Sequence, residues 1–167
     1  MENPVDLETL KSLHQRGKRL FGIDPGTKTI GIAVCDGGLS IATPYHTIRR
    51  TKYTADVIEL ARMVEIENVY GLVVGLPLNM DGSEGPRAQS SRAFIRNLRG
   101  KLDLPVALQD ERLSTVTAHE AMSEAGVRYK KRMENIDAAA AAVILQTALD
   151  RIWQGCSLIG SGAARRD

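Results

Sequence analysis

Acidic side chains fall at the boundaries of three apolar segments of this chain. Asp24 ends a short apolar run before a Pro-Gly pair, Asp110 and Glu111 follow a second run, and Asp137 precedes an alanine-rich stretch. Carboxylates that converge without a neutralising partner repel each other, so a cation is expected among them. Mg²⁺ prefers carboxylate oxygens, and two such ions roughly 3.5–4 Å apart can serve the attacking water and the leaving oxygen of phosphodiester hydrolysis. If folding brings these acids together, they predict a metal-dependent nuclease.

Each acid also has a purely structural interpretation. Asp24 before Pro-Gly can form an Asx turn, and Asp137 in the first turn of a helix can complement the helix dipole. Asp110 and Glu111 can cap a segment or pair with Arg112. Folding does not require all of these acids to lie at one edge of a sheet, so their coincidence there favours the catalytic interpretation.

Apolar runs and turn residues predict the elements that would position the acids. Short links between the first three strands favour an antiparallel meander, and a later alternation of strands and helices favours parallel pairing. The expected strands are 19–24, 30–35, 42–48, 69–74 and 106–109, and the expected helices are 54–64, with Thr54 as N-cap, then 91–102, 117–126 and 136–152. This order gives an α/β fold with a five-stranded mixed sheet, strand order 3-2-1-4-5, and helices on both faces.

This topology explains why the acids matter. Right-handed crossovers place the strands that start at Arg19, Val69 and Val106 side by side and parallel. Ligands of such sheets gather beyond the carboxyl ends of the parallel strands. Asp24 and the Asp110–Glu111 pair end two of these strands, and Asp137 opens the final helix.

Length and composition set the domain organisation. A chain of 167 residues with 43% apolar and 25% charged residues fits one domain with a hydrophobic core. We expect residues 1–17 to be an N-terminal appendage, residues 18–154 to be the nuclease domain and residues 155–167 to be a disordered tail. The formal net charge of +2 is too small to indicate nucleic-acid binding by itself.

The cellular compartment follows from what the sequence does not contain. The polar start has no apolar core typical of a signal peptide, and no apolar run is long enough to span a bilayer. Cys35 and Cys156 lie far apart without metal-ligand spacing and are expected to be reduced thiols. We therefore expect a cytoplasmic protein that does not contact a membrane.

Basic residues in turns and on one helix are candidates for phosphate contacts. Thr27 and Lys28 lie in the Gly-containing turn after Asp24, where hydroxyl groups and a lysine suit a phosphate, although an ordinary hairpin turn explains them equally well. Arg92, Arg96 and Arg99 recur at helical spacing and can follow a phosphate backbone or form a solvated basic face. The Gly- and Pro-containing loop 78–87 is suited to closing over a substrate.

Four sequence segments resemble the YqgF family of resolvase-like nucleases, also described as RuvX-like. They are GIDPGTKTIGIAV (22–34), VVGLPLNMDGSEGPRA (73–88), QDERLST (109–115) and IDAAAAAVIL (136–145). The resemblance covers about residues 18–153, nearly the whole body of the chain. It implies a ribonuclease H-like fold and a divalent-metal nuclease, with Mg²⁺ or Mn²⁺ as cofactor, that trims the 5′ end of precursor 16S rRNA in ribosome biogenesis.

The resemblance also implies roles for individual residues. Asp24, Glu111 and Asp137 would hold the metal, and the choice of Glu111 over Asp110 comes from the resemblance alone. Many relatives in the wider superfamily carry an acid at the end of the strand equivalent to 69–74, whereas this chain has GLPLN there, which leaves the number of metals open. The candidate substrate-binding residues are Thr27, Lys28, Asn79, Arg87, Arg92, Arg96, Arg112 and Ser114.

Three other functions compete with rRNA processing. A Holliday junction resolvase acting on branched DNA would use the same acids but should be an obligate dimer, whereas a processing nuclease can be a monomer or weak homodimer. The segment DPGTKTIGIAV also resembles the phosphate loop of actin-like ATPases, but that fold generally needs two such domains and this chain has room for one. The last alternative is a nucleic-acid-binding module with vestigial acids.

We expect structured RNA or branched DNA as the partner, together with ribosomal precursor particles.

Overall fold

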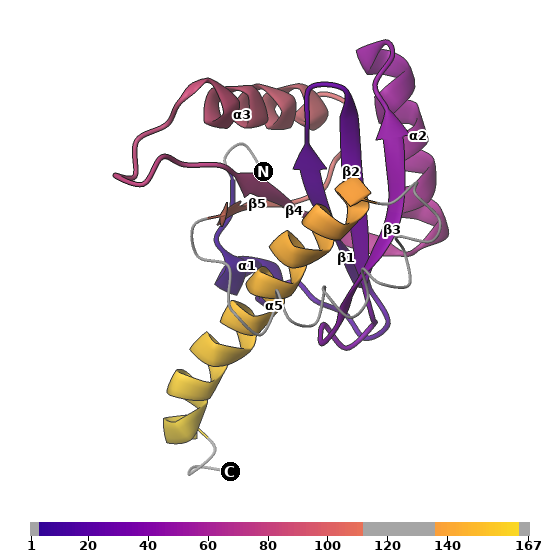
Figure 1. Ribbon diagram of the computed structural model, residues 1–167. Helices are drawn as coiled ribbons and strands as arrows, with labels where there is room; N and C mark the ends of the chain where they lie inside the picture. Colours follow the sequence, from indigo (N-terminus) through magenta and orange to yellow (C-terminus); the bar gives the residue numbers. More distant parts are fainter. Residues whose placement is uncertain (1–3, 112–135, 164–167) are drawn as a thin grey trace.

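The computed structural model describes residues 4–111 and 136–163, which form one sheet covered by helices on both faces (Figure 1). The strands are β1 (Arg19–Pro25), β2 (Thr29–Cys35), β3 (Ala42–Arg49), β4 (Val69–Leu76) and β5 (Val106–Asp110), and the helices are α1 (Leu7–Ser12), α2 (Tyr53–Ile66), α3 (Pro86–Arg99) and α5 (Ile136–Ala163). The sheet order is β3-β2-β1-β4-β5, which confirms the predicted topology. The helix expected at 117–126 lies outside the described residues.

Strand pairing places the carboxyl ends of β1, β4 and β5 at one edge of the sheet. β2 pairs antiparallel with β1 and β3, while β4 pairs parallel with both β1 and β5. In the register, Ile23 is opposite Val74, and Gly75 is opposite Gln109. Asp24, Gly75 and Gln109 therefore occupy one row across the three parallel strands.

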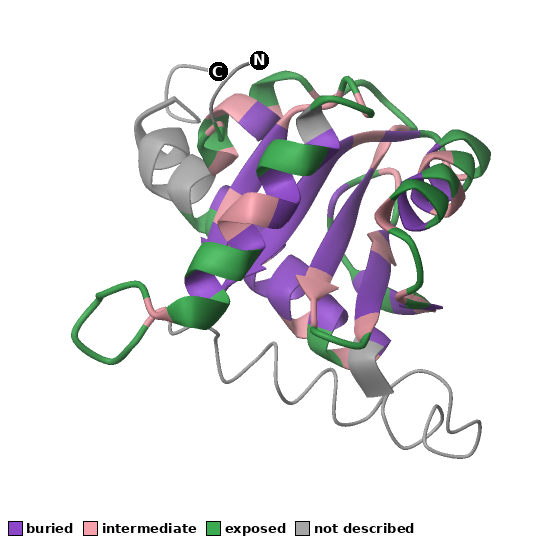
Figure 2. Ribbon diagram, turned by 90° about the horizontal axis from the view of Figure 1, so that it is seen from above, coloured by how far each residue is buried: buried purple, intermediate pink, exposed green. Residues whose placement is uncertain are grey.

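Two hydrophobic clusters divide the core between the faces of the sheet. α5 and α1 cover one face, where Leu20 and Val73 are buried beneath Leu145 and Leu149. α2 and α3 cover the other face, where Phe21 and Leu72 pack with side chains of both helices. Figure 2 shows most of the central strands buried between these layers, whereas the edge strand β3 also has exposed residues. Alternation along each strand thus determines which helix layer a side chain meets.

α5 lies unusually close to β1 because residue 22 is a glycine. A β-carbon built on Gly22 would be 2.6 Å from Cβ of Leu145 and 2.7 Å from the carbonyl oxygen of Ala141. No ordinary side chain fits at these distances, so Gly22 allows the helix backbone to approach the strand. The alanines of α5, including the fully buried Ala138 and Ala142, leave room for the same close approach.

The boundaries of three helices differ from the sequence prediction. α3 begins at Pro86 and ends at Arg99, whereas the sequence predicts a helix over 91–102. α2 begins at Tyr53 with Lys52 as N-cap, so the prediction of Thr54 as N-cap is wrong. The buried carboxylate of Asp56 instead accepts hydrogen bonds from the backbone N–H and the hydroxyl of Thr51, which stabilises an earlier start. α5 continues to Ala163, beyond its predicted end at 152.

The N-terminal segment contacts the sheet. Val5 forms an isolated parallel bridge with Ala107 of β5, and Leu10 of α1 is fully buried in the cluster beneath α5. The Tyr70 hydroxyl donates a 2.8 Å hydrogen bond to the carbonyl oxygen of Leu10. Residues predicted to form an appendage therefore contribute to the core.

In the part of the chain that the structure describes, no helix combines the length and apolar character needed to cross a membrane.

Candidate active site

Asp24 and Glu111 lie on the same face of the sheet, at the carboxyl ends of β1 and β5. Leu20 and Gly22 of β1 contact the α5 layer, and alternation places Asp24 on this face as well. Glu111 follows β5 directly, and its carboxyl carbon would be 3.2 Å from a β-carbon on Gly75. Gly75 is the residue of β4 that lies in the same row as Asp24. The two acids therefore lie near Gly75, and the charge of Asp24 acts on Glu111.

The surroundings of Glu111 disfavour a negative charge. Burial raises the pKa of its carboxyl group above the usual range, and the nearby charge of Asp24 raises it further, with a smaller contribution from Asp110. The guanidinium of Arg87 acts in the opposite direction. The Oε2 atom of Glu111 is buried and has no hydrogen-bond partner among the described residues. A cation at this point would satisfy the buried oxygen and neutralise both acids.

Asp110 differs from Glu111 in the face that it occupies. Val106 and Leu108 of β5 pack in the cluster beneath α2 and α3, and Asp110 continues this alternation. Its backbone carbonyl accepts a 3.0 Å hydrogen bond from the side-chain amide of the buried Gln109. Sheet register therefore favours Glu111 over Asp110 as the acid that faces Asp24, a choice that the sequence pattern left open.

Asp137 lies in the first turn of α5, and its side chain lies outside the described part of the structure. Its backbone is one helical turn before Ala141, whose carbonyl oxygen lies over Gly22. Asp24 is two residues beyond Gly22 along β1, in the direction of the helix N-terminus. Among the side chains that are described, no three His, Cys, Asp or Glu residues are grouped closely enough to bind a metal ion. The described acids supply the pair Asp24 and Glu111.

A pocket of about 190 Å³ opens beside Glu111, between β5 and α5. Its lining consists of Gln109, Asp110, Glu111, Ala140, Val143, Ile144 and Thr147. Apolar side chains of α5 form one wall, and the polar end of β5 forms the other. A substrate group entering this pocket would reach the carboxylate of Glu111 from the side of the edge strand.

The turn after Asp24 is held by backbone hydrogen bonds and exposes two candidate phosphate-binding residues. Gly26 N–H donates to the carbonyl oxygen of Thr29 at 2.9 Å, which closes the turn between β1 and β2. Thr27 and Lys28 are exposed at its tip. Arg50, the residue after β3, donates through Nη1 to the carbonyl oxygen of Gly26 at 2.7 Å. Thr27 and Lys28 thus lie at the same end of β1 as Asp24.

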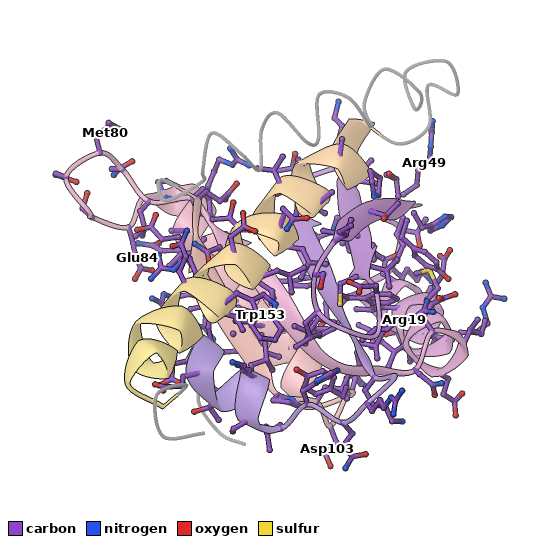
Figure 3. The ribbon with its side chains drawn as sticks, turned by 90° about the horizontal axis from the view of Figure 1, so that it is seen from below. Arg19, Arg49, Met80, Glu84, Asp103 and Trp153 are labelled. Carbon is purple, nitrogen blue, oxygen red and sulfur yellow. The ribbon has the colours of Figure 1, made fainter. Side chains whose placement is uncertain are left out.

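The loop between β4 and α3 contains Asn79, and Figure 3 shows it extending from the body with Met80 near its tip. The side-chain amide of Asn79 donates to the Ser83 hydroxyl at 3.0 Å, so it contributes to the loop's own conformation. Arg92 of α3 forms a 2.6 Å ion pair with Glu84 of the loop. This ion pair ties the end of the loop to the helix.

The other predicted substrate-binding residues have different environments. Arg87 and Arg96 are exposed on α3, and only Arg87 has a described electrostatic effect on Glu111. Arg112 and Ser114 lie outside the described residues, as does the side chain of Arg99. The structure thus brings Arg87 to the acidic pair, while Arg92 is engaged by Glu84.

Sequence reasoning overlooked two residues that shape the site. Gly75 provides the space occupied by the carboxyl group of Glu111, and Gln109 forms part of the pocket wall. A glycine inside the aliphatic run 69–76 was the available signal, because glycine in a strand often marks a close approach. No comparable signal identified Gln109, which is buried and lies opposite Gly75 in the sheet.

Comparisons with known proteins identify relatives over most of the chain. A family model described as "RuvX: Holliday junction resolvase" matches residues 18–151. Proteins named "Putative pre-16S rRNA nuclease" are similar to this chain over most of their length. One from Chelativorans sp. is 53% identical over 148 residues, which cover 89% of this chain and 92% of the relative. One from Rhodobacter capsulatus is 56% identical over 133 residues, which cover 80% of this chain and 84% of the relative.

A solved structure is also similar. Thermus thermophilus RuvC in complex with a Holliday junction substrate superimposes with a TM-score of 0.52 and 14% identity, covering 78% of this chain and 91% of its own. At this level of identity the likeness shows a shared fold, and it supports the ribonuclease H-like architecture predicted from the sequence.

Proposed function

The chain belongs to the RuvX family, and from this membership we propose that it is a divalent-metal-dependent nuclease acting on precursor 16S rRNA. It hydrolyses phosphodiester bonds, and the relatives named "Putative pre-16S rRNA nuclease" support precursor 16S rRNA as its substrate. Cleavage at the 5′ end of that RNA is what the sequence resemblance implies. This role implies work in the cytoplasm on ribosomal precursor particles. The observation that carries the proposal is the buried Oε2 of Glu111 beside Asp24.

Asp24, Glu111 and Asp137 would hold Mg²⁺ or Mn²⁺. Glu111 and Asp24 offer hard carboxylate oxygens whose mutual repulsion a cation would relieve, which is the chemistry expected of such a ligand set. Asp137 would join them from the first turn of α5. Such an ion, when bound, lowers the pKa of water and stabilises charge on the leaving oxygen. Asp110, on the other face of β5, would modulate Glu111 electrostatically.

The residues around the acids bind and orient the phosphodiester. Arg87 is close enough to influence the pKa of Glu111, so its guanidinium can hold the phosphate next to the acids. Thr27 and Lys28 can contact the phosphate backbone of the nucleic acid near the end of β1, and Arg96 can contact it along α3. Arg92, Arg112, Ser114 and Asn79 complete the proposed substrate-binding set.

A second candidate activity is cleavage of branched DNA, because the matching family model is described as a Holliday junction resolvase. The same acids would serve both substrates, since phosphodiester hydrolysis does not distinguish the sugars. A resolvase must cut two strands and needs two sites, whereas a processing nuclease acts with one. The substrate and the oligomeric state together separate these two activities.

The proposal is tested with wild-type protein, Asp24→Asn and Glu65→Gln, each with Mg²⁺, Mn²⁺ or no metal. Glu65 is an exposed acid on α2 and is the matched control for loss of one negative charge. The substrates are an RNA with the 5′ leader of precursor 16S rRNA and a four-way DNA junction. Loss of one transition-state-stabilising group typically costs about 10²–10³ in kcat, so Asp24→Asn should lose at least this much.

Each outcome of this comparison has a defined meaning. Metal-dependent cleavage of the RNA by wild type and Glu65→Gln, but not by Asp24→Asn, supports the proposal. Cleavage of the DNA junction alone supports the resolvase activity. Activity that Asp24→Asn retains in full shows that the acids identified in this structure do not catalyse the reaction.

A further inference from the structure

Arg50 links the turn that follows Asp24 to helix α3. Its backbone N–H donates to the carbonyl oxygen of Lys28 at 2.9 Å, and its guanidinium donates to the carbonyl oxygen of Gly26 at 2.7 Å. Both acceptors belong to the β1–β2 turn. Two hydrogen bonds from one residue, one of them charge-assisted, restrict how this turn can move relative to β3.

The same guanidinium also contacts helix α3. Its central carbon lies 5.7 Å from the centroid of the Phe94 ring, within the range of a cation–π contact. Phe94 is a buried residue of α3, and Tyr53 of α2 contacts it edge-on with ring centroids 6.4 Å apart. Arg50 therefore packs against a ring that is itself fixed in the core.

α3 also carries Arg87, two helical turns before Phe94, and the charge of Arg87 acts on Glu111. Arg50 thus connects the segment that presents Asp24 with the helix that presents Arg87. Nothing in the sequence pattern distinguishes Arg50 from the neighbouring basic residues Arg49 and Lys52. Only the contacts in the structure separate its role from a general contribution to surface charge.

We infer that Arg50 is a positioning residue, which fixes the distance between the metal-binding acid Asp24 and the phosphate-binding start of α3. This inference rests on the proposed nuclease function. Arg50 acts through the Gly26 carbonyl and the Phe94 ring and need not touch the substrate. Its loss should misplace Asp24 relative to the phosphate, and a displacement of about 1 Å in an active site can lower the rate about 10²-fold.

The test compares Arg50→Met, Arg50→Lys and the control Arg16→Met, which removes an exposed positive charge outside the proposed site. For Arg50→Met we expect kcat to fall about 10–100-fold while KM changes less than about twofold, because positioning affects the transition state more than ground-state binding. Arg50→Lys keeps a donor for the Gly26 carbonyl and should recover part of kcat. Arg16→Met should match the wild type.

Two further measurements separate positioning from other roles. Mn²⁺ titration of the protein without substrate should show weaker binding by Arg50→Met, because Asp24 is no longer held in place. Thermal unfolding identifies the folded fraction, and a kcat loss no greater than the loss of folded protein overturns the inference. An unchanged kcat of Arg50→Met overturns the inference too. If KM rises and substrate binding depends less on salt, Arg50 contacts a phosphate of the substrate instead, which also overturns the inference. Asp24→Asn, assayed in parallel, reports separately on the proposed function.

Discussion

The carboxyl group of Glu111 lies directly against Gly75, at a distance where a β-carbon on residue 75 would be 3.2 Å from the Glu111 carboxyl carbon. The acid and the glycine belong to neighbouring strands, and Gly75 shares a row with Asp24. The Glu111 carboxyl group therefore lies over Gly75, on the same face of the sheet as Asp24. Any side chain at residue 75 would compete with Glu111 for this space.

Gly75→Ala should reduce catalysis more than it reduces stability. The new methyl group would be 2.5 Å from Cδ1 of Ile144, a flexible side-chain end that can move, so we expect a loss of about 1–3 kcal/mol in the free energy of unfolding. Displacement of Glu111 should lower kcat at least about tenfold. Denaturant unfolding and cleavage assays measure both quantities. A variant with full activity would show that the position of Glu111 is not critical.

Gly22→Ala should be more destabilising than Gly75→Ala. Here the new methyl group would meet the carbonyl oxygen of Ala141 at 2.7 Å and Cβ of Leu145 at 2.6 Å, so the backbone of α5 must shift. The control is Gly100→Ala, whose nearest neighbour is 3.7 Å away and whose φ of −74° suits alanine. We expect this control to stabilise the protein by about 0.4–1 kcal/mol. Equal unfolding midpoints for the three variants would contradict the packing described for α5.

The raised pKa of Glu111 predicts how the stability of the metal-free protein depends on pH. The folded state holds the Glu111 proton more tightly than the unfolded chain, so this residue stabilises the fold below its ordinary pKa of 4.5. The stabilisation is lost as pH rises through the raised pKa. Glu111→Gln cannot ionise and should lack this decrease, and Mg²⁺ should reduce it in the wild type. If the free energy of unfolding depends on pH in the same way for the wild type and Glu111→Gln, the pKa of Glu111 is not raised in the folded protein.

Glu84→Gln should increase affinity for a polynucleotide. Glu84 pairs with Arg92 at 2.6 Å, and Arg92 lowers the pKa of the Glu84 carboxyl group through a hydrogen bond and its charge. Without this competing carboxylate, Arg92 can contact a phosphate, which adds roughly 0.7–0.9 to the magnitude of the salt-dependence slope. Binding to single-stranded RNA at several salt concentrations measures this slope. An unchanged slope would show that Arg92 does not bind the backbone.

The fold could be predicted from the sequence because each strand and its neighbours carry local signals. Short Gly-containing turns determine the meander of β1, β2 and β3, and intervening helices require β4 and β5 to be parallel to β1. The position of Asp24 at the end of β1 followed from the turn after it. The start of α2 could not be predicted in this way, because Asp56 accepts hydrogen bonds from Thr51 on the preceding segment.

The detailed site required tertiary information. Alternation alone does not decide between Asp110 and Glu111, because the facing direction becomes definite only when β5 is aligned with β4 through the pair Gly75 and Gln109. The engagement of Arg92 by Glu84 likewise depends on how the β4–α3 loop folds back. Local sequence shows where charged residues lie along the chain, but not which of them are already paired.

The bridge between Val5 and Ala107 has a consequence for self-association. β5 is the last strand of the sheet, and an edge strand offers unpaired backbone groups to other chains. Val5 occupies part of this edge through a 2.9 Å hydrogen bond from its N–H to the carbonyl oxygen of Val106. Shortening the N-terminus past Val5 would uncover the start of β5, and its backbone groups would then be open to pairing with the edge strand of another chain.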